Sequence, residues 1–168
     1  MSFTFVPLAK EHDRSDFRCG VPELDDWFHK RASQDERRNI ARVFLAVDDD
    51  GAIAGFYTLS AFTLSIDEMP EGLAAKLPRY DRIPAALIGR LARDERRRGD
   101  GIGDLLIADA IKRTLSASEK IAVFAIIVDA KNEAASLFYQ SFSFVPFPSN
   151  PERLFMLTST AKAALQGA

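Results

Sequence analysis

The sequence predicts an α+β domain in which helices flank a mixed β-sheet. The chain has 168 residues, of which 47% are hydrophobic and 27% charged, an ordinary composition for one globular domain. Apolar spacing predicts an N-terminal helix and three strands, and then a helix, a strand, a further helix and a last strand. No internal repeat, low-complexity segment or long linker interrupts this order. We therefore expect residues 1–168 to form a single domain.

The first half is predicted to be a helix followed by a long hairpin. Pro22 suits the first position of a helix, and the acidic residues directly after it favour the positive end of the helix dipole. Residues 42–47 (RVFLAV) are expected to be extended. The Asp50-Gly51 pair predicts a tight turn, because glycine tolerates positive φ, and residues 52–64 return as a longer strand.

The second half is predicted to alternate strands and helices. Residues 67–84 are polar and interrupted by prolines, so we expect a loop with at most one helical turn. Residues 121–128 are apolar at every position, which indicates a strand buried on both faces. The other predicted elements are a strand, two helices and a final strand, over residues 85–92, 102–115, 131–142 and 154–158.

Charge and composition exclude several classes of protein. The 22 basic and 24 acidic residues leave a net charge of −2, which excludes a uniformly basic nucleic-acid coat but not a local basic face. With only Cys19, His12 and His29 available, neither an internal disulfide nor a metal site of a usual type is expected. The N-terminus has no signal-peptide layout, and no apolar run approaches the ~20 residues of a membrane helix. We expect a cytoplasmic protein without membrane contact.

A glycine-rich turn (RRRGDGIGDLL) between a predicted strand and a predicted helix is the strongest functional signal. Gly99, Gly101 and Gly103 allow main-chain N–H groups to converge on one point. The helix beginning at Ile102 adds the positive end of its dipole, and Arg98 adds a full charge. A pyrophosphate is the natural occupant. The alternative, a flexible turn beside solvated arginines, remains open on the turn alone.

Two known phosphate loops do not match this turn. A P-loop needs a Gly-Lys pair, which the chain lacks, and the dinucleotide fingerprint needs glycine where Asp104 stands. The pattern Arg98-x-x-Gly101-x-Gly103 instead resembles the signature of the GNAT superfamily of acyl-CoA-dependent N-acetyltransferases. That resemblance implies the GNAT fold, with a central, mostly antiparallel sheet flanked by helices, and acetyl-CoA as acyl donor.

The resemblance also implies which residues hold acetyl-CoA. The pyrophosphate would lie on the main-chain amides of the turn, and the end of the preceding strand would pair with the pantetheine arm. The expected cofactor-binding residues are Leu91, Ala92, Arg93, Arg98, Gly99, Asp100, Gly101, Ile102, Gly103, Asn132 and Phe138.

Further segments resemble a narrower group, the GNAT-type toxins of bacterial toxin–antitoxin modules. These segments are residues 17–27, 54–59, 89–94, 128–130, 138–139 and 144–148. The resemblance implies aminoacyl-tRNA as the acceptor, a ribbon-helix-helix antitoxin as a partner, and a homodimer. Asp100 inside the turn and Ser143, where such toxins often have glycine, depart from the pattern.

Acetyl transfer requires a neutral amine, a stabilised carbonyl oxygen and a proton for the departing thiolate. The resemblance assigns the proton to Tyr139, whose alternative role is that of a core aromatic residue. For the carbonyl oxygen it implies a main-chain N–H group of residues 91–93. An α-amino group titrates near ~7.7–8, and an adjacent ester lowers that pKa further. A dedicated base could thus be dispensable for an aminoacyl ester, whereas a lysine side chain near ~10.4 would need one. Neither histidine is expected to act as one.

Two stretches carry a basic surplus that would suit tRNA phosphates. Residues 30–42 contain five basic and two acidic residues, and residues 79–98 contain seven arginines and three acids. Solvated surface charge is the alternative for either stretch. Two other functions stay open: a GNAT enzyme for a small amine, an antibiotic or a protein or peptide amine, and a non-catalytic acyl-CoA-binding regulator.

Overall fold

The computed structural model describes residues 2–77 and 79–166. The strands are β1 (Thr4–Pro7), β2 (Arg42–Val47), β3 (Ile53–Ser65), β4 (Arg82–Arg93), β5 (Ala125–Asp129), β6 (Val145–Pro146) and β7 (Arg153–Leu157). The helices are α1 (Pro22–Lys30), α2 (Ala32–Arg37), α3 (Glu71–Ala74), α4 (Ile102–Ala117), α5 (Glu133–Gln140) and α6 (Thr158–Gln166), with 3-10 turns η1 (Ile66–Glu68) and η2 (Glu95–Arg97).

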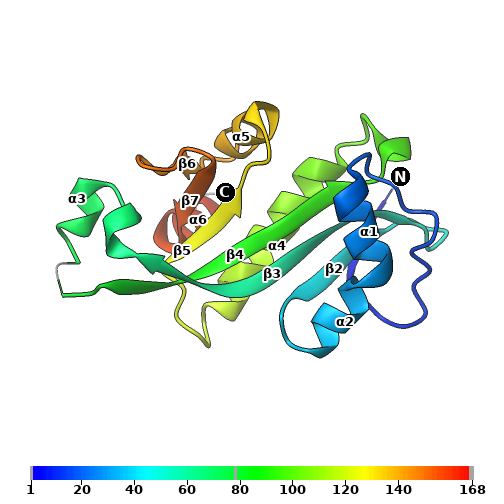
Figure 1. Cartoon of the computed structure of the whole chain (residues 1–168), viewed down its shortest axis with the longest axis horizontal. Helices are drawn as coiled ribbons and strands as arrows, with labels where there is room; N and C mark the ends of the chain where they lie inside the picture. Colours follow the sequence, from blue (N-terminus) through cyan, green and yellow to red (C-terminus); the bar gives the residue numbers. More distant parts are fainter. Residues whose placement is uncertain (1, 78, 167–168) are drawn as a thin grey trace. The chain divides into compact units, whose positions relative to one another are not determined.

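The strands form one seven-stranded sheet in the order β1-β2-β3-β4-β5-β7-β6 (Figure 1). The β4–β5 pair is parallel, whereas β1–β2, β2–β3, β5–β7 and β6–β7 are antiparallel. This confirms the predicted fold class, a mostly antiparallel mixed sheet with flanking helices.

Most predicted elements lie where the sequence placed them, but the strand predicted over residues 121–128 was wrong in its first half. β5 begins at Ala125, and Ile121 is 74% exposed. The parallel ladder starts at the pair Ala85 and Ala125, directly after Pro84, which has no N–H to continue a ladder. The elements β1, α2, β6 and α6 were not predicted from the sequence.

The described residues group into two compact units. The first comprises residues up to 60 together with residues 89–110, and the second comprises residues 61–88 and those from 111 onward. β3 and β4 each contribute residues to both units.

The core of the first unit joins α1 to the sheet. Trp27 and Phe28 of α1 are buried against Leu45 of β2 and Phe56 of β3. The rings of Phe28 and Phe56 are stacked with their centroids 4.1 Å apart. Figure 1 shows α1 and α2 beside β2 and β3. Pro22, which was predicted to occupy the first position of a helix, is the first residue of α1.

The core of the second unit surrounds β5. Residues Ala125, Ile126, Ile127 and Val128 have no exposed surface, so the part of the predicted strand that forms is buried on both faces. Phe147 and Phe155 pack with their ring centroids 4.9 Å apart, within the same apolar cluster as Ile127.

Candidate functional site

Two glycines of the predicted glycine turn have a positive φ. Gly99 has φ +88° and Gly101 has φ +74°, values that side-chain-bearing residues rarely adopt. A Cβ atom added at either glycine would have nothing within 4 Å. The space above both positions is therefore open to a ligand.

Helix α4 follows this turn directly. Ile102, its first residue, is fully buried and anchors the helix start. The first N–H groups of an α-helix have no carbonyl partner within the helix and carry the positive end of its dipole. The turn and the start of α4 together form a main-chain site suited to a pyrophosphate.

The acidic residue inside the turn is offset by a neighbouring cation. Arg97 Nη1 lies 3.8 Å from Asp100 Oδ2, and Arg97 also pairs with Asp48. Arg98, by contrast, is exposed and takes part in none of the described ion pairs. Arg98 thus remains available to an anionic ligand.

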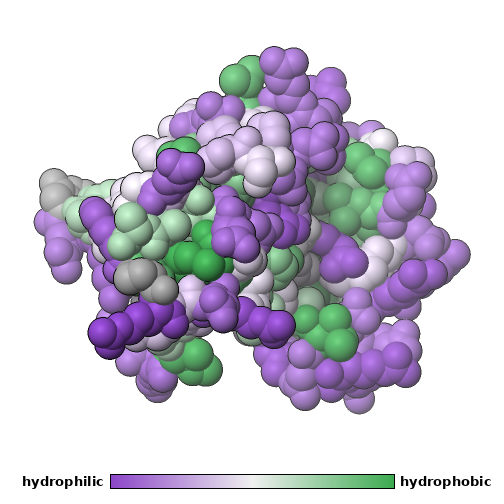
Figure 2. Space-filling model, turned by 60° about the vertical axis from the view of Figure 1, so that its left-hand side comes forward, coloured by the Kyte–Doolittle hydropathy of each residue, from purple (hydrophilic) through white to green (hydrophobic). Residues whose placement is uncertain are grey.

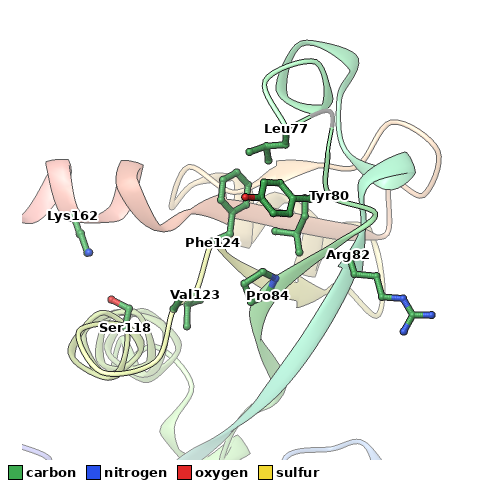
Figure 3. Close-up of a pocket in the computed structure, with 10 residues that line it drawn as sticks. Leu77, Tyr80, Arg82, Pro84, Ser118, Val123, Phe124 and Lys162 are labelled. Atoms are coloured by element: carbon green, nitrogen blue, oxygen red, sulfur yellow. The ribbon is translucent and has the colours of Figure 1, made fainter.

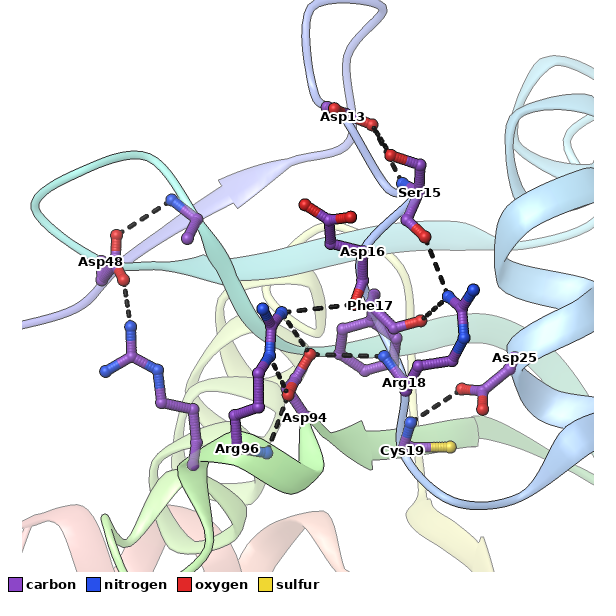
Figure 4. Close-up of polar contacts among 12 residues, drawn as sticks. Asp13, Ser15, Asp16, Phe17, Arg18, Cys19, Asp25, Asp48, Asp94 and Arg96 are labelled. Atoms are coloured by element: carbon purple, nitrogen blue, oxygen red, sulfur yellow. Dashed lines mark hydrogen bonds and ion pairs between the residues drawn. The ribbon is translucent and has the colours of Figure 1, made fainter.

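A buried carboxylate fixes the chain between the end of β4 and the turn (Figure 4). The side chain of Asp94 accepts hydrogen bonds from Arg96 N, Nε and Nη2 at 2.8, 2.9 and 2.9 Å, and from Arg18 N at 3.3 Å. The N–H of Asp94 donates to Ala54 O at 2.8 Å. Burial alone would raise the pKa of Asp94, but the hydrogen bonds from Arg96 and Arg18 outweigh it and lower that pKa. Asp94 is therefore a charged anchor for this segment.

The end of β4 and the start of α4 meet at Gly55 of β3. A Cβ atom added at Gly55 would lie 2.9 Å from the carbonyl oxygen of Ala92, 2.9 Å from Leu106 Cδ1 and 3.0 Å from Ile102 Cγ2. Because Gly55 has no side chain, the end of β4 and the start of α4, which both contain predicted cofactor-binding residues, can pack closely against β3. Sequence reasoning did not assign Gly55 to the site, although a glycine inside a strand is a sign of close approach.

In the second unit, Tyr139 lies on α5 with its side chain largely buried. Its ring packs edge-on against Phe138 and Phe144, with centroid distances of 5.4 and 5.9 Å. Its hydroxyl makes no hydrogen bond to the described residues, and Thr158 has the only sealed, unpartnered side-chain atom among them. The hydroxyl of Tyr139 is therefore packed in place but still accessible.

Burial, and then the charge of Asp129, raise the pKa of Tyr139 to about 12. The carboxylate of Asp129 is held by Arg153, with Nε–Oδ1 at 2.7 Å and Nη2–Oδ2 at 3.2 Å. Tyr139 consequently keeps its proton throughout the neutral pH range, as a proton donor must.

The other two tyrosines differ from Tyr139. The hydroxyl of Tyr57 is fully buried and donates to Asp109 at 2.5 Å, whereas Tyr80 is 61% exposed. Tyr139 alone combines a packed ring with a hydroxyl free of protein hydrogen bonds among the described tyrosines.

The two remaining predicted residues lie on or beside α5. Asn132 is the N-cap, and its Oδ1 accepts a hydrogen bond from Ala135 N at 2.8 Å. Phe138 packs between Tyr139 and Phe142. Both residues contribute to holding the helix that carries Tyr139.

The family model of the GNAT acetyltransferases matches residues 7–144 of the chain. This range includes the end of β4, the glycine turn and Tyr139. The chain belongs to the GNAT acetyltransferase family.

Two similar proteins, one of them seen in two structures, narrow the position of this GNAT acetyltransferase within its family. It is 34% identical over 158 residues to a tRNA-acetylating toxin of Mycobacterium tuberculosis, covering 94% of this chain and 93% of the toxin. The structure of AtaT complexed with acetyl-methionyl-tRNAfMet has a TM-score of 0.89 and 27% identity, over 98% of this chain and 99% of that one. A mutant AtaT toxin bound to the C-terminus of the antitoxin AtaR and acetyl-CoA has a TM-score of 0.82 and 25% identity, over 98% and 99%.

The second basic stretch of this GNAT acetyltransferase, residues 79–98, is divided between the two units and partly neutralised. Residues 79–88 belong to the second unit and residues 89–98 to the first. Arg96 and Arg97 are paired with carboxylates, which leaves Arg90, Arg93 and Arg98 outside the described ion pairs of the first unit. The residues able to meet an added anion are therefore fewer than the sequence count.

Both histidines make hydrogen bonds within the protein. His12 Nδ1 accepts a hydrogen bond from Ala9 N at 2.9 Å. His29 Nε2 lies 2.8 Å from the carbonyl oxygen of Phe17 and 3.0 Å from Arg18 Nη1. His29 is thus part of a local hydrogen-bond cluster with Phe17 and Arg18.

A separate hollow of about 400 Å³ lies in the second unit (Figure 3). Its lining contains Tyr80 and Phe124 below Leu77, and the guanidinium of Arg82 is directed away from these apolar side chains. Figure 2 shows apolar atoms recessed between hydrophilic ones on the face turned forward. None of the residues expected for catalysis or cofactor binding lines this hollow.

Neither a bilayer-spanning helix nor a metal-binding cluster is present among the described residues of the GNAT acetyltransferase. No helix among them is long and apolar enough to cross a bilayer. No group of three or more histidine, cysteine or acidic residues among them is placed to hold a metal ion.

The contact at Gly55 predicts a large effect for a small substitution. Gly55→Ala should lower the free energy of unfolding by about 1–3 kcal/mol, because a methyl group must push Ala92 or the start of α4 away. The KM for acetyl-CoA should rise with it. Gly72→Ala is the control, since Gly72 lies in α3 with nothing within 4 Å of an added Cβ. Urea unfolding and acetyl-CoA titration would show the difference, and equal effects at the two positions would contradict it.

Proposed function

We propose that this GNAT acetyltransferase is a single catalytic domain that transfers acetyl from acetyl-CoA to the α-amino group of an aminoacyl-tRNA. As the toxin of a toxin–antitoxin pair, it would block translation in the cytoplasm. The observation that carries this proposal is the similarity, over more than nine-tenths of both chains, to a tRNA-acetylating toxin. The structural likeness to AtaT in complex with acetyl-methionyl-tRNAfMet supports the same acceptor.

The open glycine turn fits the diphosphate of acetyl-CoA. Main-chain N–H groups of residues 99–103 would bind its oxygens, and Arg98 would add a counter-charge. Residues Leu91, Ala92 and Arg93 would pair with the pantetheine arm, and Asn132 and Phe138 would complete the binding set. Acetyl-CoA supplies the acetyl group as a thioester.

The chain would contribute two groups to the transfer. A main-chain N–H group at the end of β4 would donate to the carbonyl oxygen as negative charge develops on it. Tyr139 would donate a hydrogen bond, and then its proton, to the sulfur as the C–S bond breaks. The new C–N bond forms to the neutral amine, whose surplus proton passes to solvent.

No side chain is assigned as a base. The α-amino group of an amino acid titrates near ~7.7–8, and an adjacent ester withdraws electrons and lowers its pKa further. Much of an aminoacyl ester is therefore neutral near pH 7, in contrast to a lysine side chain. Both histidines make hydrogen bonds within the protein, which agrees with a transfer that uses no side-chain base.

The proposal extends to partners. The complex of AtaT with the C-terminus of its antitoxin supports an antitoxin for this chain as well, with a ribbon-helix-helix DNA-binding part expected. A homodimer is a further expectation, to be measured by light scattering of the free protein.

Labelled acetyl-CoA tests the acceptor directly. Incubation with charged tRNA, uncharged tRNA, free amino acids and a peptide pool should place label on charged tRNA only. Alkaline release of the ester should yield an N-acetyl amino acid. Label found only on small amines or peptides would overturn the tRNA acceptor and favour a GNAT enzyme with another amine substrate.

A further inference from the structure

The guanidinium of Arg90, on β4, stacks on the indole of Trp27, on α1. The Cζ atom of Arg90 lies 3.9 Å from the centroid of the ring. Trp27 is itself buried, and its Nε1 donates to Asp35 Oδ2 of α2 at 2.9 Å. The indole is thus fixed by α1 and α2, and it limits the rotation of the arginine above it.

The main chain of Arg90 is equally well fixed. Its N–H donates to Thr58 Oγ1 at 3.0 Å, and the side chain of Thr58 is buried. A side-chain acceptor therefore holds this point of β4. Arg90 is therefore fixed at both ends: Thr58 holds its main chain, and the indole of Trp27 supports its guanidinium.

Arg90 is also without a partner for its charge. No described carboxylate lies within 4.0 Å of its guanidinium, and no described group accepts a hydrogen bond from it. Arg96, Arg97 and Arg153, in contrast, each meet a carboxylate. The side chain of Arg90 is only partly exposed, and its burial lowers its pKa, with the charge of Asp35 opposing that effect.

A partly buried, unpaired guanidinium is unfavourable in the free protein. Stacking occupies the face of the guanidinium and leaves the N–H donors along its edge free. Those donors match two oxygens of a phosphate or a carboxylate. The geometry is therefore that of an anion-binding residue prepared in advance.

The position of Arg90 indicates which anion it meets. Arg90 directly precedes Leu91, so that it lies within about 10 Å of Arg93 along the strand, where the thioester is proposed to bind. In an aminoacyl-tRNA the amino acid has no free α-carboxylate, because that group is esterified to the terminal ribose. The anion nearest the reacting amine is then the phosphate of the terminal nucleotide.

We propose that Arg90, held between Trp27 and Thr58, binds the 5′-phosphate of the terminal adenosine of the acceptor and so selects tRNA-linked amines. The inference rests on the proposed function. Phosphate contacts of this kind fix the register of a nucleic acid on a protein. Acceptors that lack this phosphate would be poor substrates.

The test combines variants of Arg90 with acceptors that carry or lack the 5′-phosphate. The acceptors are 3′-aminoacylamino-3′-deoxyadenosine and its 5′-phosphate, carrying the amino acid identified with charged tRNA. The wild-type protein should prefer the phosphorylated acceptor by about 10- to 100-fold in kcat/KM, as expected for a charge-assisted hydrogen-bond pair. Arg90→Gln should reduce the preference to about one, and Arg90→Lys should keep part of it.

The control variant is Lys112→Gln, at an exposed position of α4 that lies outside both basic stretches. It should keep the full preference, and the KM for acetyl-CoA should stay the same in all three variants. A preference that survives in Arg90→Gln overturns the proposal. So does an equal loss with both acceptors, which would indicate a structural role.

Trp27 gives a readout that does not depend on turnover, because it is the only tryptophan of the chain. Titration with the 5′-phosphorylated analogue should change its fluorescence saturably, whereas the unphosphorylated analogue should not at the same concentrations. An identical response to both analogues contradicts the proposal.

The same experiment distinguishes failure of the proposed function from failure of the role assigned to Arg90. If neither adenosine analogue nor charged tRNA is acetylated while a free amino acid is, the tRNA acceptor is wrong. The anion of Arg90 would then be a carboxylate, and the phosphate assignment would fall with it. Acetylation of charged tRNA without any phosphate preference would overturn only the assignment of Arg90.

Discussion

Tyr139→Phe is expected to lower kcat by about 10²- to 10⁴-fold, the usual contribution of a positioned proton donor. The KM for acetyl-CoA should change little, because the phenylalanine ring keeps the contacts with Phe138 and Phe144. Only the hydroxyl is lost, and it makes no hydrogen bond to the described residues that would need replacement. Steady-state kinetics with charged tRNA at saturating acetyl-CoA would measure the effect.

Tyr80→Phe is the matched control, since that hydroxyl belongs to an exposed side chain that lines the separate hollow. It should leave kcat unchanged. Unchanged turnover in Tyr139→Phe would remove the assigned acid. An equal loss in both variants would show that the effect is not specific to α5.

The pH dependence follows from the raised pKa of Tyr139, about 12. A raised pKa favours the protonated form, so the donor is fully protonated below pH 10 and is lost only as the pH rises towards 12. The raised pKa of Tyr139 also stabilises the folded state. This contribution is fully present below pH 10 and is lost as the pH rises through about 12. We expect kcat to show no alkaline decline due to Tyr139 between pH 6 and 10. A decline near pH 9 that disappears in Tyr139→Phe would contradict this assignment.

Gly101→Val is expected to raise the KM for acetyl-CoA by about 10- to 100-fold, with a smaller effect on kcat. A β-branched residue at φ +74° is strained by about 1–2 kcal/mol, and relaxing that strain would reorient the main-chain N–H groups of the turn. The added side chain also fills the open space where the diphosphate would lie. Binding of acetyl-CoA measured by calorimetry would report the loss.

Gly51→Val separates ligand binding from backbone strain. Gly51 has φ +83°, and a Cβ atom there also meets nothing within 4 Å, but it lies in the β2–β3 turn. Its substitution should cost a similar amount of stability without changing the affinity for acetyl-CoA. Wild-type affinity in Gly101→Val would exclude the turn as the diphosphate site.

The features that the sequence predicted are mostly local. The turn at Gly51, the start of α1 at Pro22 and the glycine turn before α4 each depend on residues within a few positions of one another. Their backbone angles follow from the side chains they lack or carry. The candidate role of Tyr139 came instead from the family resemblance, which places the proton donor at this position.

The tertiary structure decided what distant segments do to one another. Gly55 matters because Ala92 and Ile102 approach it from segments far along the chain. The strand predicted from residue 121 begins only at Ala125, where β4 offers a partner that can continue the ladder. Neither property can be read from composition or spacing.

The sequence by itself, through its resemblance to a known family, predicted a mixed α/β acetyltransferase domain, a glycine turn suited to a diphosphate and a candidate proton donor. Only the tertiary structure decided which charges are available to a substrate. Arg96 and Arg97 are offset by Asp94 and Asp48, whereas Arg90 stacks on Trp27 without a carboxylate. The physical reason is that an ion pair depends on distance in space, and the partners of these arginines lie up to about fifty residues away in the sequence.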